Sequence, residues 1–120
     1  MPEEGESREP VLLVVFYRTK ADNEPVREWL KSLKCEDRKR IGEDIKTAQY
    51  SWPLGMPLIR KLQPGLWEVR SHINQGIARV IFTVEGQTMV LLHGFIKKSR
   101  RTPPSELKTA LQRLADLRGE

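Results

Sequence analysis

Two runs of alternating apolar residues flank Asn74–Gly76 and place the strongest constraint on how this chain folds. The runs, Leu66–His72 and Ile77–Val84, are rich in the β-branched and aromatic residues typical of strands. Asn and Gly between such runs are typical of a tight turn, so the segment predicts a β-hairpin. If the hairpin closes symmetrically about its Asn-Gln pair, facing residues have numbers that sum to 149. Arg70 then lies directly across from Arg79.

Alternation along the two strands separates an apolar face from a face that carries the arginines. The side chains expected to pack inward are Trp67, Val69, Ala78, Val80 and Phe82. Like charges directly opposite on a sheet are destabilising, so Arg70 and Arg79 need compensation. Glu68, an acidic partner or a phosphate could supply it, and a guanidinium can bind phosphate through two parallel hydrogen bonds. The alternative is a solvated surface pair whose side chains splay apart.

Apolar residues at helical spacing predict three helices. The first follows Asn23, a suitable N-cap, and has Pro25 in its first turn. The second runs from about Asp37 to Tyr50, and the third begins near Thr102. The inward positions are Val26, Trp29, Leu30 and Leu33, then Ile41, Ile45 and Ala48, then Leu107, Ala110, Leu111, Leu114 and Leu117. We expect the start of the third helix to direct free backbone N–H groups toward a bound anion.

Further strands are predicted at Val11–Tyr17 and Thr88–Gly94, with a shorter one near Ile59–Leu62. The resulting order is a strand, two helices, an antiparallel meander and a closing helix. We therefore expect an α+β fold in which two N-terminal helices pack on an antiparallel four- to five-stranded sheet, with a C-terminal helix added. Residues 11–118 would form a single domain. Residues 1–10 are charged and nearly devoid of apolar side chains, which predicts a disordered acidic tail.

Positive charge is concentrated between Lys46 and Ser105. That stretch holds nine lysines and arginines against two acidic residues, Glu68 and Glu85, which gives it a charge of +7. The formal net charge of the chain is +5, so the remaining residues contribute −2. A basic segment of this kind suits a polyanion such as nucleic acid, and an acidic protein partner would fit equally well.

The cellular compartment of the protein can be inferred from features that the sequence lacks. A single cysteine, Cys35, excludes an intramolecular disulfide and a site with several cysteine ligands. No apolar run approaches the roughly 20 residues that span a bilayer. The acidic start of the chain has neither the basic region nor the apolar core of a secretory signal. We expect a cytoplasmic protein with no membrane partner.

A second basic cluster follows the last predicted strand. Lys97, Lys98, Arg100 and Arg101 occur within five residues, in a loop between a strand and a helix. Phe95 precedes them and could stack against an unpaired base, an interaction worth about 1–3 kcal/mol per base. The alternative is that Phe95 belongs to the core and that the lysines are merely solvated.

The two histidines differ in their expected roles. His72 shares a strand face with Glu68 and Arg70, so it could act as a general acid or base. His93 alternates with Met89 and Leu91, which favours a core or structural role. Two histidines without clustered carboxylates argue against a metal site, and no nucleotide-cofactor fingerprint is present. We expect neither a metal nor a cofactor.

Three segments together resemble the phage-derived HigB branch of the RelE/ParE toxin superfamily: IRKLQPGLWEVR, GIARVIFTVEG and VLLHGFIKKSRRTPPSELKTAL. The resemblance extends over roughly residues 11–117. It implies a RelE-like fold and the toxin of a type II toxin–antitoxin system, a metal-independent endoribonuclease that cuts mRNA on the ribosome and inhibits translation. It also implies a helix-turn-helix, HigA-like antitoxin as partner, through which the toxin would associate with DNA indirectly.

The resemblance also implies roles for particular residues. Arg70 and Arg79 correspond to catalytic cations, and either Lys97 or Lys98 corresponds to the cation after the last strand. The expected RNA-binding residues are Lys61, Phe95, Arg100, Arg101 and His72. The reaction would be attack of a ribose 2′-OH on the adjacent phosphate, with cations stabilising the transition state. The alternative within the superfamily is a ParE-like inhibitor of DNA gyrase, which acts by protein–protein contact and is not a nuclease.

Overall fold

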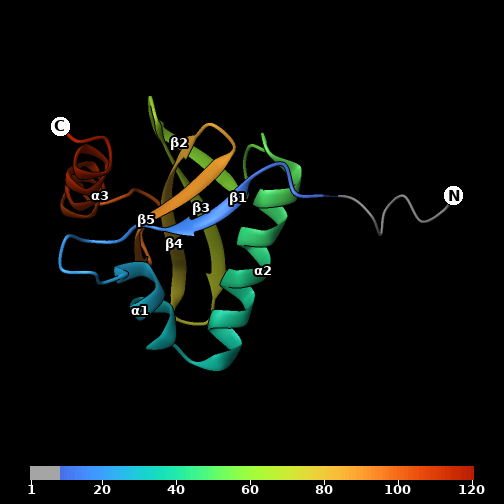
Figure 1. The fold of residues 1–120 in the computed structure, drawn as a ribbon. Coiled ribbons are helices and arrows are strands. Elements are labelled where there is room, and N and C mark those ends of the chain that lie inside the picture. The colour runs from blue at the N-terminus through green and yellow to red at the C-terminus, as the bar shows by residue number, and fades with distance from the viewer. Residues whose placement is uncertain (1–8) are drawn as a thin grey trace, which may run out of the picture.

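The strand-rich second half of the chain forms the centre of the structure, a computed structural model that describes residues 9–120 (Figure 1). Four consecutive strands pair in antiparallel fashion: β2 (Ile59–Gln63), β3 (Leu66–Ile73), β4 (Gly76–Glu85) and β5 (Thr88–Lys97). The predicted meander is therefore confirmed, including its short first strand. The predicted tail, residues 1–10, lies mostly outside the described residues.

The first strand, β1 (Leu13–Phe16), corrects the expectation of an antiparallel sheet. It runs parallel to β5, with Val15 paired to Val90, and the strand order is β1-β5-β4-β3-β2. Parallel neighbours require a crossover connection, because the chain must return to the same end of the sheet before the second strand begins. The two helices after β1 belong to that connection. The continuous run of apolar, partly β-branched residues in β1 indicates a strand but does not indicate which strand it pairs with.

Two helices, α1 (Pro25–Lys31) and α2 (Cys35–Ser51), cover one face of the sheet, as predicted. Their buried side chains pack against the apolar residues of the hairpin in one core cluster. Its helical members are Val26, Ile41, Ile45 and Ala48, and its sheet members include Val69, Val80, Phe82, Met89 and Leu91. The T-shaped contacts of Trp52 with Trp67 and Phe82 extend this core beyond the end of α2.

The N-cap of α1 is Glu24, so the prediction of Asn23 at this position was wrong. Asn23 instead closes the preceding loop, since its carbonyl accepts a hydrogen bond of 2.8 Å from the backbone of Thr19. The backbone N–H of Asn23 in turn donates to the Thr19 hydroxyl. Pro25 occupies the first turn, where a missing N–H removes no intrahelical hydrogen bond.

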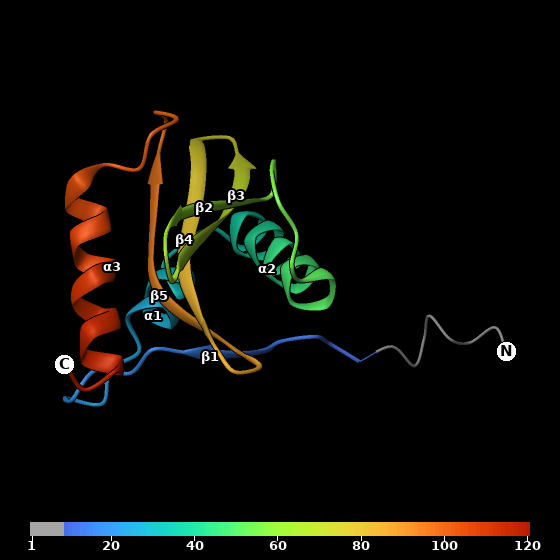
Figure 2. The ribbon, with the colours of Figure 1, turned by 90° about the horizontal axis from the view of Figure 1, so that it is seen from above.

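The last helix, α3 (Pro104–Leu117), packs on the opposite face of the sheet, so that the helices enclose the sheet from both sides (Figure 2). A second core cluster lies beneath it, formed by Tyr17, Leu66, Ile81, Val90, Leu92, Phe95, Ala110 and Leu114. The face of the hairpin that carries the arginines is therefore a partly apolar, covered surface. Among the helices of residues 9–120, none combines the length and the apolar character needed to cross a bilayer.

A register shift between β4 and β5 changes which face the end of β5 presents. Ile81 pairs with His93 and Phe82 pairs with Leu91, so Leu92 is the extra residue of a β-bulge. A single extra residue inverts the alternation beyond it. His93 consequently lies on the α3 face, whereas Met89 and Leu91 lie on the α1/α2 face. The prediction that His93 alternates with these two residues was wrong for this reason.

The bulge also turns Gly94 toward the α1 side of the sheet, where the Trp29 ring covers its Cα. A Cβ at this position would collide with three ring atoms of Trp29. Gly94 is therefore needed for the close approach of α1 to β5, and helix and strand are held together at this point.

Candidate functional site

The arginine pair lies where the hairpin register predicts it. Arg70 on β3 is paired directly with Arg79 on β4. Both side chains are on the α3 side of the sheet, opposite Val69 and Val80. They are not solvated, however, because Arg79 is 0% and Arg70 9% exposed. The alternative of an exposed, splayed pair is excluded.

The loop between β5 and α3 covers these arginines. We call residues 99–102 the strap, because their backbone crosses the arginine side chains. Arg79 donates through Nη1 to the carbonyl of Arg101, at 2.7 Å, and through Nη2 to the carbonyl of Ser99. Arg70 donates to the carbonyl of Arg100 at 3.4 Å. The guanidinium groups thus face backbone oxygens of the chain itself.

A third arginine joins the pair from β2. Arg60 is paired with Glu68 in the sheet register, and its Nη1 donates to the carbonyl of Arg100 at 3.1 Å. We call Arg60, Arg70 and Arg79 the arginine cluster. Lys61 was the residue predicted from this strand, but its pairing with Trp67 places it on the other side of β2, where it is exposed. Alternation along β2 could have identified Arg60. Residues two apart share a face, so Arg60 lies on the same face as Leu62 and opposite Ile59.

One buried carboxylate, Glu68, balances part of this charge. Its Oε2 accepts a hydrogen bond of 2.7 Å from Arg70, and its Oε1 accepts one of 2.9 Å from the Thr102 hydroxyl. Glu68 is completely buried. The carboxylate therefore joins the sheet to the end of the strap. It is also the first of the three predicted ways in which the like charges of Arg70 and Arg79 could be compensated.

The electrostatic state of the arginine cluster reflects this burial. Burial lowers the pKa of Arg79, Glu68 opposes that effect, and the positive charges of Arg70 and Arg60 lower the pKa further. An arginine titrates so far above neutrality that it stays protonated despite such a shift. The Nε of Arg79 is buried and has no hydrogen-bond partner among the described residues. Together with Glu68, the arginine cluster thus has a net charge of two positive units, and one of its N–H donors is unused.

The comparisons with known proteins bear on this site. A family model described as phage-derived protein Gp49-like (DUF891) matches residues 28–115, which is more than half of the chain. The chain belongs to the Gp49-like family. This is a RelE/toxin-like family, and the matched segment includes all three arginines and the strap. No curated protein matches the chain.

The exposed surface of the Gp49-like site is basic. The side chains of Lys97, Lys98, Arg100 and Arg101 are all exposed, although the carbonyls of the last two bind the buried arginines. A shallow hollow beside them is lined by Ser99, Arg101, Thr102, Pro103 and Pro104. The strap therefore presents cations outward while its backbone faces the arginine cluster.

The start of α3 offers fewer free donors than expected. The helix begins at Pro104 with Pro103 as its N-cap, and neither residue has a backbone N–H. The N–H groups of Glu106 and Leu107 both donate to the carbonyl of Pro103. The expectation of several free N–H groups at this helix start was wrong, because two prolines remove the donors.

Phe95 is not placed as expected of an RNA contact, and the two histidines lie in different surroundings. Phe95 is 6% exposed, and its ring stacks on His93 at 5.6 Å with Arg79 above it at 5.8 Å. His93 binds Glu106 of α3 at 2.6 Å, so it joins β5 to α3. In this structure Phe95 is a core residue. His72 is exposed near the end of β3, and in the register only Ile77 separates it from Lys97.

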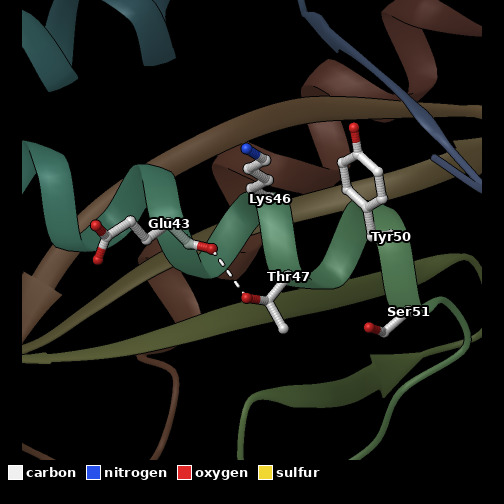
Figure 3. Close-up of a pocket in the computed structure, with 5 residues that line it drawn as sticks. All are labelled: Glu43, Lys46, Thr47, Tyr50 and Ser51. Atoms are coloured by element: carbon white, nitrogen blue, oxygen red, sulfur yellow. Dashed lines mark hydrogen bonds between the residues drawn. The ribbon is translucent and has the colours of Figure 1, made fainter. Parts of the chain in front are cut away.

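A second hollow lies on α2 of this Gp49-like chain, away from the arginine cluster (Figure 3). It is lined by Glu43, Lys46, Thr47, Tyr50 and Ser51, and no residue predicted for the site lies in it. The Thr47 hydroxyl donates to the Glu43 carbonyl within the helix, at 3.1 Å. Lys46 lies 5.9 Å from the centre of the Tyr50 ring, so the hollow is an open helix surface with locally paired side chains.

Proposed function

We propose that the protein is the toxin of a type II toxin–antitoxin pair, of the HigB type, and that it cuts mRNA on the translating ribosome. The observation that carries the proposal is the convergence of Arg60, Arg70 and Arg79 beneath a loop with four exposed cations. Membership of a RelE/toxin-like family supports it independently. The RelE-like fold expected of such a toxin agrees with the α+β architecture and its five-stranded sheet.

The proposed reaction is an internal transesterification of the RNA backbone. The 2′-OH of one nucleotide loses its proton to water and attacks the adjacent phosphorus. The bond to the 5′ oxygen of the next nucleotide breaks, and a 2′,3′-cyclic phosphate forms. Arg70 and Arg79 bind the non-bridging oxygens, whose negative charge increases in the transition state. Lys97 or Lys98 donates a proton to the departing 5′ oxygen. The ribosome holds the message in a productive orientation, which replaces part of the catalysis that a strong general base would provide.

The exposed cations define the proposed partners. Arg100, Arg101 and the two lysines bind the message and ribosomal RNA, and His72 extends this surface along the end of β3. A helix-turn-helix antitoxin with an acidic interface would cover the same cations, and it would carry the toxin to DNA indirectly. Activity on ribosomes places the protein in the cytoplasm. The proposed chemistry requires no metal and no cofactor.

The test uses purified protein in a reconstituted translation reaction, with primer extension on the message. We expect new 5′ ends on translated mRNA and little cleavage of the same RNA without ribosomes. The matched control is Lys31→Gln combined with Lys34→Gln, which removes two exposed cations outside the site and should cleave normally. Lys97→Gln combined with Lys98→Gln should cleave much more slowly. An intact message in the presence of ribosomes and unchanged protein contradicts the proposal.

A second candidate, inhibition of DNA gyrase by protein contact, is favoured by one observation. Arg79 is fully buried and bonded to backbone carbonyls, as expected of a structural arginine. A supercoiling assay with the same preparation distinguishes the two candidates. Loss of supercoiling with an intact message supports gyrase inhibition, and cleavage with normal supercoiling supports the nuclease.

A further inference from the structure

The strap occupies the arginine cluster in the manner of a bound anion. Its three successive carbonyl oxygens, from Ser99 to Arg101, accept hydrogen bonds from all three arginines of the cluster. The two non-bridging oxygens of a phosphodiester share one full negative charge, so they bind guanidinium groups more strongly than neutral carbonyls do. The buried, unpartnered Nε of Arg79 shows that the strap does not use every donor of the cluster.

The strap is held by polar contacts rather than by apolar packing. Residues 99–102 read Ser-Arg-Arg-Thr, so no apolar side chain anchors the strap, and its first three side chains are exposed. Opening it would consequently expose no apolar side chain of its own. One strap side chain is hydrogen-bonded to the sheet: the hydroxyl of Thr102 donates to Glu68 at 2.9 Å.

We infer that the strap is a displaceable lid that closes the arginine cluster, with the Thr102–Glu68 hydrogen bond as its latch. A phosphodiester of single-stranded RNA opens the lid by replacing the strap carbonyls on the guanidinium groups. The identity of this ligand rests on the proposed function, whereas the closed lid and its latch rest on the contacts alone. The free protein is therefore held in a closed state, and its apparent affinity for RNA is reduced by the fraction of molecules that are closed.

The first experiment measures access to the arginines without any ligand. Phenylglyoxal modifies guanidinium groups, and peptide mass spectrometry gives the rate at each arginine. In the unchanged protein, Arg70 and Arg79 should react at least about tenfold more slowly than Arg100 and Arg101, since they react only when the lid opens. Equal rates at buried and strap arginines overturn the inference, and this arm needs no variant.

The latch is tested by Thr102→Val, which removes the hydroxyl and nearly preserves the shape of the side chain. Its loss should raise the reaction rates of Arg70 and Arg79 by about tenfold, the change expected for a hydrogen bond to a carboxylate. The matched control is Thr109→Val on α3, where the lost hydroxyl binds only the carbonyl of Ser105. Thr102→Ser keeps the hydroxyl and should behave as the unchanged protein. Equal rates in the two valine variants overturn the inference.

Global unfolding is distinguished from lid opening by Arg113. This arginine belongs to α3 and is partly buried against β5, where it donates to the carbonyl of Leu92 at 2.8 Å. Its reaction rate should stay at the wild-type value in Thr102→Val if only the lid has opened. If the reaction rate of Arg113 rises together with those of Arg70 and Arg79, the variant has unfolded. The comparison of buried and strap arginines in the unchanged protein then decides whether the inference holds.

The second experiment follows the lid as RNA binds. Spin labels on the native, exposed Cys35 and on Ser99→Cys report the distance from α2 to the strap. A 2′-O-methyl RNA oligonucleotide, which cannot attack its own phosphate, should shift that distance distribution. The same oligonucleotide should leave unchanged the distance distribution of a control pair, in which the labels are on Cys35 and on Gln112→Cys of α3. Binding without a shift overturns the inference. Absence of binding, with latch-dependent labelling still observed, contradicts the proposed ligand and leaves the lid established.

Discussion

Glu68 and Arg70 form an ion pair of 2.7 Å between two side chains of the same strand face, in which the carboxylate is completely buried. The pair belongs to a network, because Glu68 also accepts the hydrogen bond of Thr102 and lies beside Arg60 in the sheet register. A buried charge that loses its partner keeps its desolvation cost and loses the compensating attraction. The stability of the sheet beneath the strap should therefore depend strongly on this one carboxylate.

Glu68→Gln tests that dependence. The substitution preserves the size of the side chain but leaves the arginine cluster with three positive charges and no negative one. We expect the free energy of unfolding to fall by about 3 kcal/mol, as measured by urea denaturation. The control is Glu85→Gln, because Glu85 pairs with Arg118 at 3.2 Å on the exposed surface. It should change stability by less than about 1 kcal/mol. Equal losses of stability in the two variants would show that the buried ion pair contributes no more to the free energy of unfolding than the exposed one does.

Arg79→Met separates the chemical role of an arginine from its role in folding. Burial disfavours the charged form of Arg79, as the direction of its pKa shift shows, so an apolar side chain of similar length should replace it with little cost. We expect a change in stability below about 2 kcal/mol, together with loss of growth inhibition, because transition-state cations contribute several kcal/mol. Thermal midpoints and induced toxicity measure the two effects.

Val80→Ala is the matched control for that variant, since Val80 is adjacent in sequence but buried on the α1/α2 face. Removing its methyl groups should lower stability by about 1–3 kcal/mol, and the folded fraction should remain toxic. Full toxicity of Arg79→Met would remove Arg79 from the proposed site. A variant that fails to fold would identify Arg79 as a structural anchor of the strap.

The exposed cations of the loop should determine how RNA binding depends on salt. Substitution of Lys98, Arg100 and Arg101 by Gln should leave stability within about 0.5 kcal/mol, because all three side chains are exposed. It should reduce the slope of log affinity against log salt by about 0.7 for each phosphate group that the variant no longer neutralises. The charge-matched control replaces Lys31, Lys34 and Lys39, which are exposed on the α1/α2 side. Anisotropy titrations with a 2′-O-methyl oligonucleotide provide the slopes, and identical slopes would exclude the loop from the binding surface.

Tyr17 should make the stability of the fold sensitive to alkaline pH. Burial, and then the 2.6 Å hydrogen bond to Asp116, raise the pKa of Tyr17 above its ordinary value of 10.0. The folded chain thus holds the phenolic proton more tightly than the unfolded chain does. The stabilisation is complete below pH 10.0 and declines as the pH rises from there toward the raised folded pKa.

Tyr17→Phe should therefore lower stability by about 1 kcal/mol at neutral pH and remove that part of the alkaline decline. Denaturation curves between pH 8 and about pH 11 measure it, and the difference from the unchanged protein cancels the contribution of the lysines. Tyr50→Phe, on the open face of α2, is the control and should leave the decline in place. A decline that is the same in Tyr17→Phe would show that the phenol is not responsible.

Local features of the chain were predictable from the sequence because their causes are local. The pairing of Arg70 with Arg79 follows from the two-residue turn and the period of a strand, and the structure confirms it. The buried positions Ile41, Ile45 and Ala48 follow from helical spacing. In both cases a short window of sequence contains the whole physical cause.

The errors come from contacts between distant segments. The parallel partner of β1 is set by a crossover, which no pattern within Val11–Tyr17 encodes. One bulge at Leu92 moves His93 to the other face, and the position of a bulge depends on both strands. The burial of the arginines depends on the strap returning over them, and hydropathy predicts the opposite for such residues. Arg60 was missed because its cluster partners lie on other strands.

The parallel pairing of β1 with β5 also has a consequence for how the chain is made. Val15 emerges from the ribosome well before its partner Val90, because the whole segment between them must be translated first. At about 5–20 residues per second, the apolar segment Val11–Tyr17 waits several seconds without the strand that it will bind. Throughout that interval it is an unpaired, β-prone apolar strand, the kind of segment that aggregates or recruits chaperones. The nascent chain is therefore most vulnerable between the emergence of Val15 and that of Val90, when β5 becomes available to pair with β1.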